Sequence, residues 1–226
     1  YGQIAETLNA IDGPRGLMAE VESSYAKTSA TQRSQGEAIS VSTAISDLIG
    51  SARGDLEKFF RELKGHFDQS VDLDDPVRSH LRITDETREH LDWETIQNNW
   101  INISQLFDMI ASNIYRMNQT LAGLTNRTSL DSDGLRAELL TKESELTDLK
   151  SWIDRFLSEP TSEDVYWLES TPAEGVSLNT APGHVGKMLR SKLFGKKSSI
   201  VLTSATLAVD SSFDLVRDRL GIDEAE

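Results

Sequence analysis

The longest periodic pattern in this sequence is a stripe of apolar residues between Trp93 and Leu124. Steps of three and four positions alternate along it, so all its members fall on one face of an α-helix. They are Trp93, Ile96, Trp100, Ile103, Phe107, Ile110, Ile114, Met117, Leu121 and Leu124. Such a helix is about 45–50 Å long. A chain that contains it must bury the stripe against other long helices.

A second helical stripe follows, with members Leu135, Leu139, Leu146, Leu149, Ile153 and Phe156. The polar connection between the stripes is short, so we expect the two helices to pack antiparallel. The aromatic members Trp93, Trp100 and Phe107 are hypothetical base-stacking residues. Their helical spacing favours a buried core instead.

Three shorter helical patterns precede the long stripe, beginning at Ile4, Leu17 and Val41. Asp12-Gly13-Pro14 separates the first two. We expect residues 28–36 to form a loose link, and Gly50 and Gly54 to weaken the third helix.

Residues 79–83 alternate polar and apolar side chains, which is typical of a short strand or hairpin. Thr84 or Asp92 is expected to cap the start of the long helix that follows.

The pattern changes after Pro160. Residues 165–168 and 176–178 are strand-like, residues 184–194 are helical, and Ser211 or Ser212 can begin a helix that stops at Gly221. The β-branched run 199–203 is typical of a strand buried on both faces. We therefore predict a mainly α fold. Residues 1–160 would form an elongated antiparallel helical bundle and residues 161–226 a small α/β piece.

Composition excludes several classes of site. The net charge of −14 repels nucleic acid at long range, so any contact with DNA must be local. The chain contains no cysteine, which excludes disulfides, thiolate zinc sites and iron–sulfur ligation within it. The four histidines and the acidic clusters lack the spacing of a metal site, so we predict no metal ligands. No apolar run is long enough to span a bilayer.

The concentrated basic patch lies between residues 184 and 209, where no acidic residue occurs. Its members are Lys187, Arg190, Lys192, Lys196 and Lys197. It is a candidate contact for a DNA phosphate backbone, as is Arg82 near the predicted strand. The alternative is an ordinary solvated helix face.

Three hydroxyl side chains follow the predicted strand 199–203, where functional groups gather in open parallel sheets. They belong to Thr203, Ser204 and Thr206, and they surround the small Ala205. Hydroxyls alone cannot hydrolyse a phosphoanhydride, so the pattern favours a coupling or positioning role over catalysis. A polar turn that merely caps the strand is the alternative.

This segment resembles the Ser-Ala-Thr motif of superfamily 2 helicases, in the form found in the XPD/DinG family. The resemblance extends over residues 165–221, through Val165–Glu169, Val176–Pro182, Leu193-Phe194 and the Phe213–Gly221 region. Leu81–Thr84 and Trp100 are weaker matches upstream.

The resemblance implies an internal piece of an ATP-dependent DNA helicase that acts on single-stranded or forked DNA in DNA repair. Residues 1–160 would be the arch-like insertion that frames the DNA path. Thr203, Ser204, Ala205 and Thr206 would couple ATP hydrolysis to unwinding, together with the remaining motor domains of the same polypeptide. We expect a cytoplasmic, nucleoid-associated protein without a membrane segment.

The sequence departs from a complete helicase, because it lacks the Gly-Lys-Ser/Thr phosphate loop and the Asp-Glu-Ala-His box. ATP and Mg²⁺ would therefore bind elsewhere in the parent, and this piece alone would be inactive. An iron–sulfur cluster, where the family has one, would also lie elsewhere. The alternatives are a non-enzymatic acidic helical module that dimerises through the stripe at 93–124, or an acidic DNA mimic.

Overall fold

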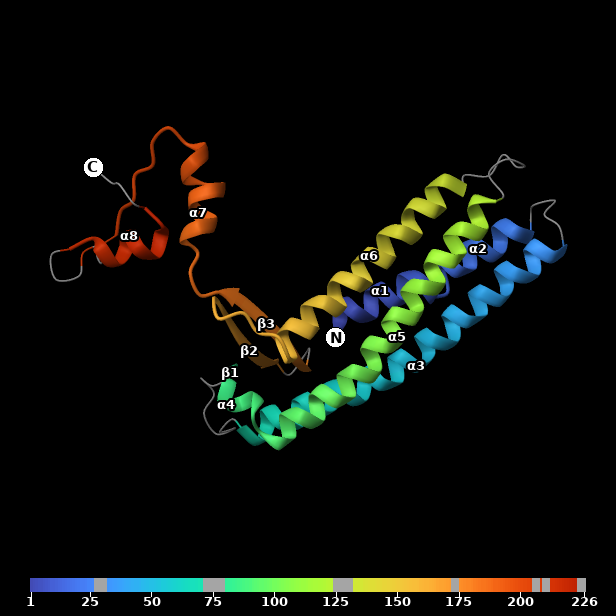
Figure 1. Ribbon diagram of the computed structural model, residues 1–226, viewed down its shortest axis with the longest axis horizontal. Helices are drawn as coiled ribbons and strands as arrows, with labels where there is room; N and C mark the ends of the chain where they lie inside the picture. The colour runs from blue at the N-terminus through green and yellow to red at the C-terminus, as the bar shows by residue number, and fades with distance from the viewer. Residues whose placement is uncertain are drawn as a thin grey trace.

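Long helices that run side by side make up most of the molecule (Figure 1). The structure is a computed structural model that describes residues 1–26, 32–70, 80–123, 132–171, 175–204, 208 and 212–222. The helices are α1 (Gly2–Asp12), α2 (Leu17–Ala26), α3 (Gln32–Ser70), α4 (Asp85–Arg88), α5 (Leu91–Ala122), α6 (Ser132–Leu157), α7 (Gly186–Lys192) and α8 (Asp214–Leu220), with a 3-10 turn η1 (Phe194–Lys196). The strands are β1 (His80–Ile83), β2 (Asp164–Thr171) and β3 (Gly175–Pro182). The predicted mainly α fold is confirmed.

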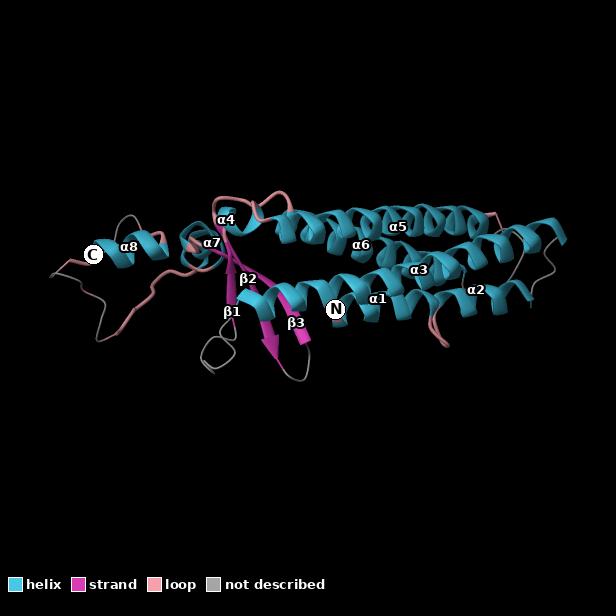
Figure 2. Cartoon of the chain, turned by 90° about the horizontal axis from the view of Figure 1, so that it is seen from below, coloured by secondary structure: helices cyan, strands magenta, loops and turns pink. Residues whose placement is uncertain are grey.

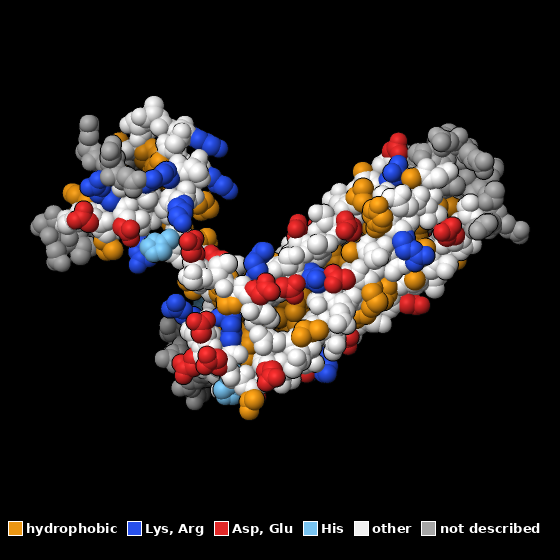
Figure 3. All heavy atoms as spheres, in the orientation of Figure 1, with side chains coloured by type: hydrophobic (Ala, Val, Ile, Leu, Met, Phe, Trp, Pro, Cys, Tyr) orange, Lys and Arg blue, Asp and Glu red, His pale blue; other side chains and the backbone are white. Residues whose placement is uncertain are grey.

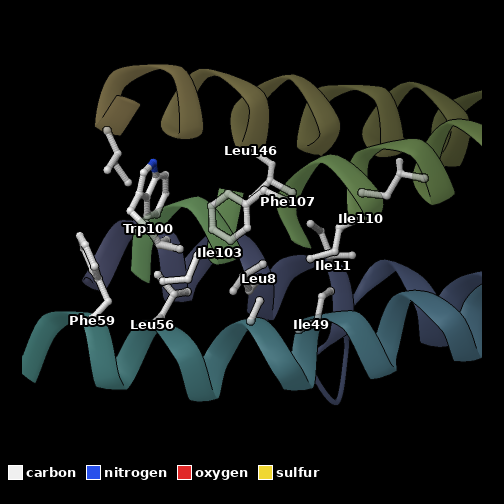
Figure 4. Packing of buried hydrophobic residues seen from close by; sticks show 14 of the residues in the cluster. Leu8, Ile11, Ile49, Leu56, Phe59, Trp100, Ile103, Phe107, Ile110 and Leu146 are labelled. Atoms are coloured by element: carbon white, nitrogen blue, oxygen red, sulfur yellow. The ribbon is translucent and has the colours of Figure 1, made fainter. Parts of the chain in front are cut away.

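The bundle consists of α3, α5 and α6, with α1 and α2 following each other as a broken fourth rod (Figures 1 and 2). Successive long helices run antiparallel, and α5 packs against both α3 and α6. The apolar stripe of α5 from Trp93 to Leu121 is buried between them. Figure 4 shows Trp100, Ile103 and Phe107 pointing inward toward Phe59 of α3 and Leu146 of α6. The stripe is therefore buried in the core of its own chain, so it cannot form the interface of a dimer.

The link expected at residues 28–36 is corrected by the structure. Residues 32–36 belong to α3 rather than to a loose link, and residues 28–31 lie outside the described residues. Helix α3 continues through Gly50 and Gly54. Each glycine costs about 1 kcal/mol relative to alanine, whereas the same helix buries Ile45, Ile49, Ala52 and Leu56.

The caps also differ from the prediction. Thr84 caps α4, because its side chain accepts a hydrogen bond from the Thr87 amide and Thr87 reciprocates in a capping box. His90 takes the N-cap of α5, where its Nδ1 accepts from the Asp92 amide. The intervening α4 is the reason that Thr84 cannot reach the long helix.

A three-stranded antiparallel sheet in the order β1-β2-β3 closes one end of the bundle (Figure 2). Leu168 of β2 lies opposite Leu178 of β3, and Ile83 of β1 lies opposite Tyr166. The inward face is apolar, since Tyr166, Leu168 and Ile83 are buried in the same core as the helices. The sheet thus joins residues on both sides of position 160, where we predict a domain boundary.

Helices α7 and α8 and the turn η1 form the C-terminal unit, in which α7 packs against η1 and α8 (Figure 1). Helix α8 ends as predicted, with Gly221 in the left-handed conformation at φ 69°. No helix among the described residues is long and apolar enough to cross a membrane.

Candidate coupling segment and nucleic-acid interface

The predicted strand at 199–203 is not formed. Residues 197–204 are neither helix nor strand, and Val201 is 83% exposed. A strand covered on both faces needs neighbouring strands and helices, but the sheet among the described residues is the separate β1-β2-β3 sheet. The prediction is therefore wrong for this chain taken alone.

The candidate coupling residues follow this exposed run. Thr203 and Ser204 are exposed and lie in the same segment without regular structure. Ala205 and Thr206 lie outside the described residues. In sequence the segment runs from η1 to α8, so its two ends are anchored in the C-terminal unit.

The C-terminal unit is held together where α7 meets the end of α8. A Cβ atom on Gly186 would lie 2.7 Å from the Gly221 nitrogen, so only glycine permits this approach. Arg190 donates from Nε and Nη2 to the Gly221 carbonyl oxygen, at 2.9 and 2.8 Å. Arg190, a predicted DNA contact, thus satisfies a carbonyl at the C-terminus of α8.

Lys187 reaches in the opposite direction, toward the sheet. Its Nζ lies 3.4 Å from Oε1 of Glu163, and the two side chains are 91% and 74% exposed. Exposed ion pairs of this kind contribute about 0–1 kcal/mol. The pair therefore gives only weak attachment of α7 to the segment before β2.

Three further cations of the basic patch lie on the outside of the C-terminal unit. Lys192 ends α7, and Lys196 and Lys197 lie in and just after η1, all exposed. Figure 3 shows lysine and arginine side chains gathered on this lobe. Among the described residues, no acidic side chain lies within ion-pair distance of these three lysines. They are therefore the members of the patch best placed to meet a phosphate.

Arg82 is not part of this patch. It is exposed on β1, opposite Trp167 of β2, and belongs to the sheet at the end of the bundle. Of the five predicted cations between Lys187 and Lys197, the structure leaves Lys192, Lys196 and Lys197 exposed on the C-terminal unit, directs Lys187 toward Glu163 and Arg190 toward the Gly221 carbonyl, and places Arg82 on a separate element.

Neither the aromatic stripe nor the metal-type residues form a site. Trp93, Trp100 and Phe107 are at most 2% exposed, so the predicted core role is confirmed and base stacking is excluded in this fold. In the described part of the chain, no group of His, Cys, Asp or Glu is arranged to hold a metal ion.

Among the described residues, the groove large enough for a nucleotide has a mixed lining with more carboxylates than lysines and arginines. A groove of about 940 Å³ lies between α1, α6 and β3. Its acidic lining residues Glu6, Glu145 and Asp148 outnumber its cations Lys142 and Arg155, and Lys142 already pairs with Glu145 at 2.8 Å. Such a lining repels phosphates.

The sequence does not indicate where the side chain of Arg88 lies. Arg88 lies on the short helix α4, and its side chain is only 11% exposed. Burial lowers the pKa of its guanidinium, and the charges of Asp85 and Tyr166 act in the opposite direction. The group donates from Nη2 to the Phe156 carbonyl oxygen and lies 5.1 Å from the centre of the Tyr166 ring.

Two curated proteins of Bacillus subtilis (strain 168) are similar to parts of this chain. One, named 3'-5' exonuclease DinG, is 27% identical over 127 residues, which cover 54% of this chain and 13% of that protein. The other, named probable ATP-dependent helicase YpvA, is 33% identical over 81 residues, covering 34% of this chain and 12% of that protein. The chain thus spans a small part of each relative. No family model and no solved structure matches it.

Both relatives confirm that this chain resembles a piece of a DinG-like, helicase-related protein.

Proposed function

We propose that this chain is an internal part of an ATP-dependent DNA helicase of the DinG type. Residues 1–160 are its arch-like insertion, and residues 161–226 are the end of its first motor domain. The resemblance over residues 165–221 and the names of both relatives support this assignment. The parent would be a hydrolase acting on ATP, and this chain alone would be inactive.

The observation that carries the proposal is the exposed apolar surface of the C-terminal unit. Its exposed members are Met188, Leu193, Ile200, Val201, Leu202, Phe213 and Leu215. We infer that another part of the parent covers these side chains, because a soluble protein rarely exposes so many large apolar groups on so small a unit. The β-branched run 199–203 fits a strand whose neighbouring strands and helices belong to the rest of the motor domain.

A formed strand at 199–203 separates the coupling segment from two of the lysines. Lys196 and Lys197 precede the strand, whereas Ser204 and Thr206 follow it. Five strand residues span about 17 Å. We therefore assign coupling between nucleotide site and motor domains to Thr203, Ser204, Ala205 and Thr206, at one edge. Lys192, Lys196 and Lys197 contact the DNA backbone from the other.

The remaining assignments follow from the same proposal. The substrate is single-stranded or forked DNA, and the protein works at the nucleoid, in the cytoplasm, in DNA repair. ATP and Mg²⁺ bind to parts of the parent outside this chain, because this sequence lacks the Gly-Lys-Ser/Thr phosphate loop and the Asp-Glu-Ala-His box. Any iron–sulfur cluster must also be held elsewhere, since this chain has no cysteine.

Charge reversal of the three lysines tests the function. We expect the full-length parent to hydrolyse Mg-ATP and single-stranded DNA to stimulate it. Lys192→Glu, Lys196→Glu and Lys197→Glu together should abolish most of that stimulation. For three lost phosphate contacts, the slope of log affinity against log salt should fall by about 2. Fluorescence anisotropy with labelled single-stranded DNA measures this slope.

The matched control reverses three exposed cations of α3, through Lys58→Glu, Arg61→Glu and Lys64→Glu. It changes the net charge by the same amount and should leave stimulation and slope unchanged. Equal losses of stimulation and slope in both variants would mean that only the total charge of the protein matters and that the three lysines do not contact DNA. A full-length parent without ATPase activity would remove the proposed function itself.

A further inference from the structure

The end of α6 is held by side chains from other helices. The last carbonyl groups of a helix have no partner within it. Here the Leu157 carbonyl oxygen accepts from Trp93 Nε1 at 3.1 Å and from Gln97 Nε2 at 2.9 Å. The Phe156 carbonyl oxygen accepts from Arg88 Nη2 at 3.1 Å. The point where the chain leaves the bundle is thereby fixed to α4 and α5.

Arg88 extends this attachment to the sheet. Its guanidinium lies over the Tyr166 ring of β2, and that ring also packs edge-on against Phe156 at 5.6 Å. The Tyr166 hydroxyl in turn accepts a hydrogen bond from the Thr161 amide at 3.0 Å. One largely covered cation therefore contacts the end of α6 and the strand that follows it. A planar guanidinium can bond and stack at once, which an ammonium group does less well.

The other end of the β2–β3 hairpin is attached far more weakly. Between β3 and α7 the chain passes through residues 183–185, where the Gly183 amide donates to the Glu163 carbonyl oxygen. Beyond that point the exposed pair of Lys187 with Glu163 links α7 to the segment just before β2. Helix α7 otherwise packs within its own unit, against η1 and α8.

We propose that Arg88 is a positioning residue that fixes the three-stranded sheet to the helical bundle. Turning between the bundle and the C-terminal unit is then confined to residues 183–185. The role of this joint in DNA unwinding rests on the proposed function. The bundle and sheet would move as one body relative to the segment that carries Thr203 and Ser204. Movement driven by ATP hydrolysis would then reach the bundle, where the DNA strands separate, through residues 183–185.

Distance measurements on the 226-residue chain test the joint. The chain has no cysteine, so two introduced cysteines can be spin-labelled without background. Lys58→Cys with Thr180→Cys, from α3 to β3, should give one narrow distance distribution. Lys58→Cys with Ser191→Cys, from α3 to α7, should give a clearly broader one. Arg88→Met should broaden the first distribution markedly and should not narrow the second, because α7 is joined to the bundle through the sheet. Arg88→Lys should restore part of the narrowness of the first.

Amide hydrogen exchange gives a second measure in the same chain. Arg88→Met should speed exchange in residues 157–168 by about tenfold and leave α3 and the middle of α5 unaffected. Arg82→Met, at an exposed arginine of the neighbouring β1, is the control and should change neither segment. Unchanged distances and exchange in Arg88→Met would overturn the proposal, as would equally narrow distributions for both label pairs.

DNA unwinding by the full-length parent tests whether the joint matters for function. Arg88→Met should lower the number of base pairs opened per ATP hydrolysed at least severalfold, while DNA-stimulated hydrolysis continues. If the Arg88→Met parent hydrolyses ATP and opens as many base pairs per ATP as the wild type, Arg88 does not help to transmit movement to the bundle. The proposed function would still hold. If the wild-type parent has no ATPase activity, the proposed function is refuted. The distance measurements would still decide whether residues 183–185 act as a joint.

Discussion

Ser204→Ala together with Thr206→Ala in the full-length parent is expected to reduce DNA unwinding about 10- to 100-fold. Each hydroxyl hydrogen bond contributes about 0.5–1.5 kcal/mol, and a loss of about 1.4 kcal/mol from the rate-limiting barrier is tenfold in rate. Mg-ATP binding should stay nearly intact, because neither residue belongs to a phosphate loop. Strand displacement and calorimetric nucleotide titration measure the two effects separately.

The matched control lies in the same segment. Ser198→Ala with Ser199→Ala removes two exposed hydroxyls just before the apolar run and should leave unwinding unchanged. An equal loss of nucleotide binding and unwinding in the Ser204 and Thr206 variant would assign these residues a structural role. Full unwinding in that variant would remove the coupling role altogether.

Trp100→Ala is expected to destabilise the bundle by about 3–5 kcal/mol, the usual cost of deleting a large buried aromatic side chain. Trp100 is 2% exposed, its ring contacts Phe59 and Phe107, and its Nε1 donates to Asp154 at 2.6 Å (Figure 4). The substitution therefore leaves a cavity between α3, α5 and α6 and a carboxylate without its donor. Urea denaturation followed by circular dichroism measures the loss.

Ile101→Ala is the control on the same helix. Ile101 is 50% exposed, so its truncation should change the free energy of unfolding by less than about 0.5 kcal/mol. Comparable losses in the two variants would mean that the stripe of α5 is not the bundle's core. A stable Trp100→Ala variant with weakened DNA binding would instead revive the base-stacking hypothesis.

The bundle could be predicted from the sequence because helical periodicity reports burial directly. Nine of the ten stripe residues between Trp93 and Leu124 are buried in α5, and Leu124 lies outside the described residues. The strands at 80–83, 165–168 and 176–178 were also predicted, since alternation marks a sheet with one buried face. The antiparallel pairing of β1 with β2 could not be predicted. Its partners, such as His80 and Glu169, are 89 positions apart in the sequence, and local patterns carry no information over that distance.

The site was less predictable, for two physical reasons. The run 199–203 has the composition of a buried strand, but composition records the surroundings a segment evolved in and not those present in this chain. Arg88 looks like any surface arginine, because its burial depends on Phe156 and Tyr166, which come together only in the folded chain. Arg190 likewise becomes a helix cap only through the approach of Gly221 to α7.

Hydrogen exchange at the backbone amides of Ile200, Val201 and Leu202 decides whether this segment is a strand completed by the rest of a motor domain. In the 226-residue chain these residues are exposed and outside regular structure, so their amides should exchange at nearly the unprotected rate. In the full-length parent they should be slowed by about 100-fold or more, as expected for a central strand. Equally fast exchange in the two proteins would contradict the proposal that the remaining motor domain covers this segment.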